Sequence, residues 1–161
     1  MTEIELQTFT ENYSSQDFDK IKFDWNGQHA EKFRDNNFDY RMQLCEFLIP
    51  QINTVKLDLI RDLYIELSKW AKEAWCVYGK YHLLAQQLLV RGGTDYILDY
   101  LNGATQCFDT LLASGRVSLT KEQNQNLLDY INDNLKTTTD ESQRNLLQVG
   151  KDRFEKALHV N

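Results

Sequence analysis

The sequence predicts an all-α protein, a compact antiparallel bundle of about five or six helices that follows an irregular N-terminal arm. Its 161 residues include one proline and seven glycines, too few for a turn-dense all-β chain. From residue 38 onward, apolar residues recur at intervals of three and four, which is the spacing of one helix face. Short connections favour antiparallel neighbours, either in a bundle or as stacked hairpins. We expect one domain, with an arm over 1–37 packed on a helical body over 38–161.

The N-terminal arm lacks clear helical periodicity. Residues 21–25 alternate between apolar and polar side chains, which is the period of a strand. Asn26-Gly27 follows directly and is a dipeptide typical of hairpin turns. A short β-hairpin, an irregular arm and a short helix near residues 15–22 all agree with this pattern.

The first half of the body predicts three helical segments. The first spans 38–49 and ends at Pro50, the one proline of the chain. The second starts near residue 53 and keeps the helical spacing to residue 78, after which Gly79 is expected to break or kink it. The third, over 81–90, is so apolar that we expect it to be buried on most sides.

The fourth helix is expected over 94–113. Arg91-Gly92-Gly93 is a helix-stop signal, with a cation in the last turn and glycine as the cap. Thr94 then suits the N-cap of the next helix. The expected apolar face of that helix consists of Ile97, Tyr100, Leu101, Ala104, Cys107, Phe108, Leu111 and Leu112.

Two further helices complete the chain. Thr120 and Gln123 have the spacing of a capping box, which predicts a helix reaching about Lys136. A polar turn follows, and Thr139 or Asp140 is expected to cap the last helix. Both helices carry their apolar residues at helical spacing, so each should pack one face on the body.

The charge of the chain is concentrated near its start. The net charge is −6, and residues 1–40 hold nine acidic and four basic residues, which contribute −5 of it. The same residues include eight of the 19 aromatic side chains. Nucleic-acid binding normally requires a basic surface, so we expect no nucleic-acid partner.

This acidic, aromatic segment motivates the first functional hypothesis, a non-catalytic protein of inhibitor, immunity or adaptor type that binds a basic protein partner. Acidic groups attract such a partner, and aromatic rings hold it once water is displaced. The simpler interpretation is an arm that wraps the body, with its rings filling gaps and its acids solvated. The residues expected to contact the partner are Asp17, Phe18, Asp19, Phe23, Asp24 and Trp25.

Two alternatives belong to other functional classes. The second hypothesis is a helical bundle that binds a small apolar ligand in a pocket lined by Trp70, Trp75, Tyr78, Tyr81, His82, Tyr96 and Tyr100. The third is an enzyme without a recognisable motif that uses His82 or a carboxylate stripe. That stripe, Asp58, Asp62 and Glu66, is interleaved with Arg61, Lys69 and Lys72, which favours a solvated, salt-bridged helix face.

The sequence points to no cofactor or metal. His29, His82 and His159 are isolated, and no phosphate-binding or hydrolase motif is present. Cys45, Cys76 and Cys107 are expected to be reduced, buried thiols. No signal-peptide pattern and no apolar run of the ~20 residues that a membrane helix needs are present, so we expect a soluble, cytoplasmic protein with no membrane contact. Nothing in the sequence indicates its oligomeric state.

Overall fold

The computed structural model describes residues 2–159, and within that range it contains eight α-helices and no β-strand. The all-α prediction is confirmed, but the helices are more numerous than the five or six expected. An unexpected helix forms near the N-terminus, and the segment over 94–113 is divided in two. The helices are α1 (Glu3–Asn12), α2 (Phe38–Leu48), α3 (Leu57–Ala74), α4 (Tyr81–Gln87), α5 (Ile97–Ala104), α6 (Phe108–Ser114), α7 (Lys121–Thr137) and α8 (Glu141–His159).

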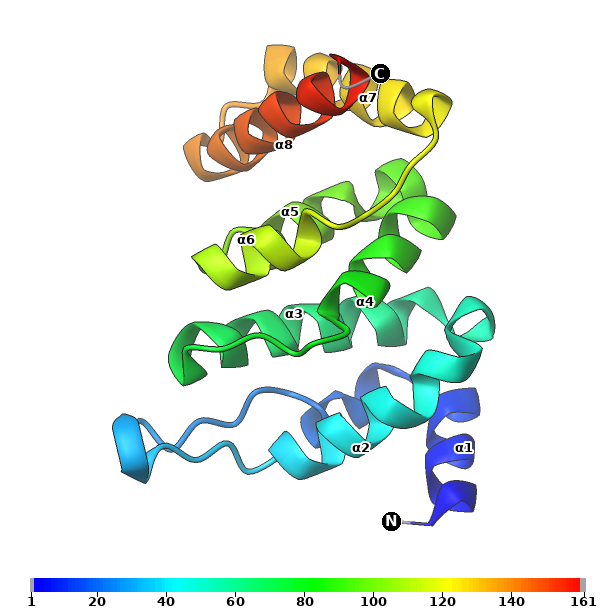
Figure 1. Cartoon of the computed structure of the whole chain (residues 1–161), viewed down its shortest axis with the longest axis vertical. Coiled ribbons are helices and arrows are strands. Elements are labelled where there is room, and N and C mark those ends of the chain that lie inside the picture. Colours follow the sequence, from blue (N-terminus) through cyan, green and yellow to red (C-terminus); the bar gives the residue numbers. More distant parts are fainter. Residues whose placement is uncertain (1, 160–161) are drawn as a thin grey trace.

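The helices are stacked in layers along the longest axis of the molecule (Figure 1). The N-terminal segment, α1 and α2 lie at one end, and α7 and α8 lie at the other. Between them α3 packs on α4 and α5, and α5 in turn packs on α6 and α8. One cluster of buried apolar side chains extends from Leu6 in α1 to Phe154 in α8, so the layers share a continuous core. No helix in residues 2–159 combines the length and apolar character that crossing a membrane requires.

The N-terminal segment differs from the expected arm because it begins with a helix. Thr2 and Glu5 form a capping box: the Thr2 hydroxyl accepts from the Glu5 amide at 3.3 Å, and the Glu5 carboxylate accepts from the Thr2 amide at 2.8 Å. A 3₁₀ helix follows over Ser15–Lys20. The predicted alternation over 21–25 does not form a hairpin, and the one β-type pairing in the described part of the chain is an isolated bridge between Trp25 and Asp35.

The second predicted helix ends earlier than expected. We expected the break at Gly79, but α3 ends at Ala74 because Trp75 adopts the left-handed conformation, with φ 56° and ψ 35°. Nothing in the local sequence signals this, since tryptophan is not a residue that favours left-handed backbone.

The predicted helix over 94–113 is interrupted by residues 105–107. Cys107 is extended, with φ −157°, and is the N-cap of α6, which begins at Phe108. Thr94 is not the N-cap of α5, because a 3₁₀ helix occupies Gly93–Tyr96 and α5 starts after Tyr96. The interruption turns α6 relative to α5, so that part of the expected apolar face points outward.

The last two helices begin as predicted. The Thr120 hydroxyl accepts from the Gln123 amide at 3.1 Å, and the Gln123 side chain accepts from the Thr120 amide at 2.9 Å. At the start of α8, the Asp140 carboxylate accepts from the Gln143 amide at 2.9 Å. These caps are local in sequence, which is why the sequence alone identifies them.

Candidate functional site

An open groove of about 780 Å³ lies where the N-terminal segment meets the end of α3, and we call it the α3 groove. One wall is formed by residues 29–35 and the first turn of α2, and the other by the C-terminal end of α3 and the two residues after it. Both walls carry aromatic and charged side chains. The groove is lined by His29, Ala30, Phe33, Arg34, Asp35, Phe38, Asp39, Trp70, Glu73, Ala74, Trp75 and Cys76.

The loop that forms the first wall is held closed by Asn26. Its side-chain oxygen accepts from the backbone amides of Gln28, at 3.2 Å, and Arg34, at 3.1 Å. Its amide group donates to the carbonyl of Lys32 at 2.8 Å. Gly27 follows with φ +74°, a conformation that glycine adopts without strain. The Asn26-Gly27 dipeptide therefore forms a bend within a closed loop, and the hairpin turn that this dipeptide predicted does not form.

The same loop is attached to α2 by a buried ion pair between Arg41 and Asp35. Arg41 also donates to the carbonyls of Ile21 at 3.1 Å and Lys22 at 3.2 Å. Asp35 in turn accepts from the amide of Asp24 at 3.1 Å. Charged groups out of water need such partners, so this network fixes where the first wall lies.

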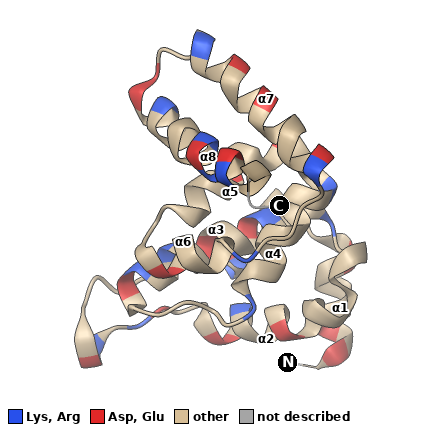
Figure 2. Ribbon diagram, turned by 45° about the horizontal axis from the view of Figure 1, so that its top comes forward, with Lys and Arg blue, Asp and Glu red and all other residues tan. Residues whose placement is uncertain are grey.

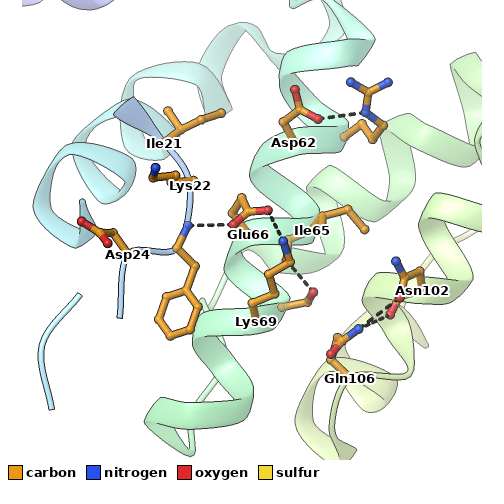
Figure 3. A network of polar contacts seen from close by, with 12 residues as sticks. Ile21, Lys22, Asp24, Asp62, Ile65, Glu66, Lys69, Asn102 and Gln106 are labelled. Atoms are coloured by element: carbon orange, nitrogen blue, oxygen red, sulfur yellow. Dashed lines mark hydrogen bonds and ion pairs between the residues drawn. The ribbon is translucent and has the colours of Figure 1, made fainter. Parts of the chain in front are cut away.

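A second attachment links the N-terminal segment to α3 through Glu66 (Figure 3). The Glu66 carboxylate accepts from the backbone amide of Phe23 at 2.7 Å and from the Lys69 ammonium at 2.6 Å. Glu66 is buried, whereas the sequence predicted a solvated position on a polar helix face. The expected pairing with Lys69 forms, but the solvated position is wrong because Glu66 also accepts from a backbone amide 43 residues away in sequence.

The remaining carboxylates of the predicted stripe are also engaged. Arg61 bonds Asp58 at 3.1 Å and Asp62 at 2.9 Å, which agrees with the expected salt-bridged face. The Tyr13 hydroxyl donates to Asp62 at 2.6 Å. Burial is the main cause that raises the pKa of Tyr13, and this hydrogen bond raises it further. The stripe thus serves to hold α1 and the segment after it against α3.

Aromatic rings stack in and beside the α3 groove. The Phe23 ring lies 6.4 Å from that of Trp25 at 13° and 6.3 Å from that of Phe33 at 26°. Across the groove, Phe38 stacks on Trp70 with ring centres 5.0 Å apart. Trp75 lines the same groove, so all three tryptophans of the chain are in it or beside it.

The backbone is strained on both walls of the groove. Ala30, on the loop, and Trp75, after α3, have φ of 55° and 56°. They are the two non-glycine residues with positive φ in residues 2–159, and both line the α3 groove. Such strain concentrates at functional sites, because the surrounding structure must hold it in place. Trp75 is moreover 86% exposed.

The charge available in the groove is negative. Glu73 lies 4.0 Å from the Nδ1 of His29, and Asp39 has no ion-pair partner among the described residues. Arg34 also lines the groove, but its guanidinium donates to the carbonyls of Phe33 at 2.8 Å and Glu31 at 3.3 Å. The carboxylates of Glu73 and Asp39 therefore share the groove with one guanidinium, that of Arg34, which is already hydrogen-bonded to the loop backbone.

The predicted partner-contacting acids mostly make local bonds. Asp17 pairs with Lys20 at 3.0 Å and Asp19 with Lys22 at 2.9 Å, and the bond to Lys20 is the main cause that lowers the pKa of Asp17. Asp24 accepts from the Asn36 amide group at 2.9 Å. Of the predicted rings, Phe18 packs on the core, while Phe23 and Trp25 belong to the aromatic stack beside the groove.

The predicted ligand-pocket residues do not come together. Trp75 and Trp70 line the α3 groove, whereas Tyr100 lines a second groove between α6 and α8. The Tyr78 hydroxyl donates to Glu46 at 2.7 Å and that of Tyr96 donates to Asp58 at 3.1 Å, away from either groove. His82 is half-buried on α4 and also lines neither of them, while Tyr81 is stacked on Tyr64 in the core.

The thiols differ from one another in burial. Cys45 is buried, and burial raises its pKa to about 12. Cys107 is half-buried, and Cys76 is exposed at the α3 groove, so the expectation of three buried thiols is wrong for these two. Cys76 is exposed because α3 ends one residue before Trp75, which carries the chain away from the core.

Comparisons of the chain with protein-family models, with curated proteins and with solved structures find no match. Within residues 2–159, no group of three or more His, Cys, Asp or Glu side chains is placed to hold a metal ion. The α3 groove, with its strained walls, exposed tryptophan and available carboxylates, is therefore the candidate binding site of this chain.

Proposed function

We propose that this chain is a small non-catalytic binding protein, of inhibitor, immunity or adaptor type, that receives a basic segment of a protein partner in the α3 groove. The observation that supports this most is the pair of left-handed residues, Ala30 and Trp75, one on each wall. Left-handed backbone costs a non-glycine residue roughly 1–2 kcal/mol. The Trp75 ring recovers little of that cost by burial within the chain, because it is largely exposed.

The chemistry of the groove suits a cationic side chain. A guanidinium or ammonium group over an indole ring gains about 0.5–2 kcal/mol, more when water is displaced. Trp75 offers such a ring, because it is exposed, and Glu73 and Asp39 offer carboxylates in the same groove. Arginine fits best, because its planar group can stack on a ring and bond a carboxylate in the same pose.

Long-range charge supports the same class of partner. The first 40 residues carry −5 of the net −6, and acidic residues of α1 and α2 lie at the end of the molecule that holds the groove (Figure 2). Although Asp17 and Asp19 are paired locally, the net field of this end stays negative and favours the approach of a basic surface.

A small aromatic or apolar ligand is the second candidate occupant. The volume of about 780 Å³ falls within the range of small-molecule sites, and four aromatic side chains line the groove. This hypothesis keeps the class of function that the sequence suggested but moves the pocket, and Trp70 and Trp75 are the residues that the predicted pocket and the α3 groove share.

A defined peptide library tests the proposal. We expect short labelled peptides with arginine or lysine at a fixed central position to bind, as measured by fluorescence anisotropy, and the matching peptides with glutamate there not to bind. Trp75→Ala should abolish binding, and Glu73→Gln and Asp39→Asn should weaken it most at low salt. Ile4→Ala is the matched control, because Ile4 is also a largely exposed apolar residue but lies on α1.

The outcomes separate the hypotheses. Basic peptides that bind Trp75→Ala as tightly as the unmodified chain would contradict the proposed site. Tryptophan fluorescence provides a second readout, since all three tryptophans lie at the groove. If an uncharged aromatic compound changes that fluorescence saturably while no basic peptide does, the small-ligand hypothesis replaces the first.

A further inference from the structure

Helix α6 is built with its polar side inward. Thr110 and Ser114 are fully buried, whereas Phe108 is 71% and Leu112 57% exposed, and Leu111 is exposed as well. The buried hydroxyls are satisfied: Thr110 donates to the Ala104 carbonyl at 3.1 Å, and Ser114 shares a hydrogen bond with the Tyr64 hydroxyl at 2.9 Å. Because these bonds fix the helix in this orientation, its large apolar side chains face away from the core of the chain.

A groove of about 830 Å³ lies beside these side chains, between α6 and α8, and we call it the α6 groove. Its apolar lining includes Leu111 and Leu112 from α6 and Val149 and Ala157 from α8. Phe108 does not line it but stands one turn away on the same stripe of α6, at the i, i+3 and i+4 spacing from the two leucines. One face thus carries both a projecting aromatic ring and an apolar hollow.

We propose that the α6 groove is the interface between two copies of this chain, with Phe108 of each copy inserted into the groove of the other. A two-fold interface requires a face that is complementary to itself, and a projection beside a hollow meets that requirement. Contiguous exposed apolar side chains of this kind mark interaction sites, with buried aromatic residues contributing most.

The charges on this face are also complementary across a two-fold axis. Three charged residues, Asp152, Arg153 and Lys156, line the α6 groove. The Arg153 guanidinium already donates to the Ser114 carbonyl, whereas Asp152 and Lys156, which have opposite signs, are exposed. Across a two-fold axis, Asp152 of one copy can pair with Lys156 of the other, and the reverse pair forms by symmetry. The acidic N-terminal end lies at the far end of the stack from α7 and α8, so this arrangement does not require the two most acidic regions to meet (Figures 1 and 2).

Sedimentation velocity of the full chain tests this inference. We expect a species of twice the 19.0 kDa chain mass, whose share rises with concentration. Phe108→Glu and Leu112→Glu should each convert it to monomer with unchanged helical circular dichroism, because both side chains are exposed in the single chain. Ile4→Glu, exposed on α1, is the control and should leave the dimer intact.

A charge exchange tests the two-fold arrangement. Asp152→Lys and Lys156→Asp should each weaken the dimer, and the double variant should restore it, because the exchange re-forms both pairs. A chain that stays monomeric at every concentration, a dimer indifferent to both glutamate variants, or a double variant no tighter than the singles would overturn the inference. Trp75→Ala, which removes the ring proposed to bind a basic partner, should leave the dimer unchanged, so failure of one proposal is distinct from failure of the other.

Discussion

Arg41 and Asp35 form an ion pair in which both side chains are shielded completely from solvent. The pair joins the loop wall of the α3 groove to α2, and Arg41 extends the link to the backbone carbonyls of Ile21 and Lys22. The groove therefore depends on two charges that the sequence places only six residues apart.

Removing one member of this pair should destabilise the fold strongly. Asp35→Asn or Arg41→Leu leaves the other group short of its partner in a buried site, which typically costs about 3–5 kcal/mol. We expect the midpoint of urea unfolding to fall accordingly for both variants. Lys136→Ala, which removes the exposed pair with Asp133, is the control and should leave the midpoint unchanged. Equal midpoints for all three variants would show that the buried pair does not secure the loop.

A second prediction concerns the tyrosine stack of the core. Tyr64 lies between Tyr81, at 4.5 Å between ring centres, and Tyr100, at 6.2 Å. A β-carbon at Gly103 would come within 2.3 Å of the Tyr64 ring, and that ring is fully buried and stacked with two other tyrosines, so it has little room to give way. Gly103→Ala should therefore lower the free energy of unfolding by about 1–3 kcal/mol.

Gly79 offers the matched control for that substitution. A β-carbon there meets nothing within 4 Å, so Gly79→Ala should unfold at the same urea concentration as the unmodified chain or slightly above it. If Gly103→Ala is as stable as Gly79→Ala, the close packing of α5 on α3 is wrong.

Features that depend on neighbouring residues could be predicted from the sequence, and features that depend on distant contacts could not. The Thr120 capping box and the Asp140 cap of α8 are predicted because their signals are local. The capping box of Thr2 and Glu5 is equally local and would have revealed α1. The burial of Glu66, the early end of α3 at Trp75 and the α3 groove itself depend on contacts between segments far apart in sequence.

A third prediction concerns alkaline pH. Burial raises the pKa of Tyr64 to about 12 from its ordinary value of 10.0, and burial also raises the pKa values of Tyr81 and Tyr100. Between pH 10 and about pH 12, these tyrosines have lost their protons in the unfolded chain but keep them in the folded chain. The free energy of unfolding therefore falls as pH rises. We expect the urea midpoint to be steady below about pH 10 and to drop above it.

Tyr64→Phe tests the origin of that pH dependence. The variant lacks one of the buried ionising groups, so its urea midpoint should fall less steeply with pH over the same range. Absorbance of ionised tyrosine provides the second measurement, because the buried fraction should appear together with the loss of helical circular dichroism. A midpoint that does not change above pH 10 would show that the stack can ionise without unfolding.

The last prediction separates stability from binding at the α3 groove. Trp75→Gly removes the left-handed strain, and because the ring is exposed, little packing is lost. We expect the free energy of unfolding to rise by about 1 kcal/mol while binding of basic peptides is lost. Ala30→Gly relieves the same strain on the opposite wall without removing a ring, so it should also stabilise the chain but weaken peptide binding much less than Trp75→Gly does. Urea unfolding and peptide anisotropy measure the two effects on the same samples. If Trp75→Gly is less stable than the unmodified chain, the tryptophan is there for the fold, and the argument that its strained position serves a partner fails.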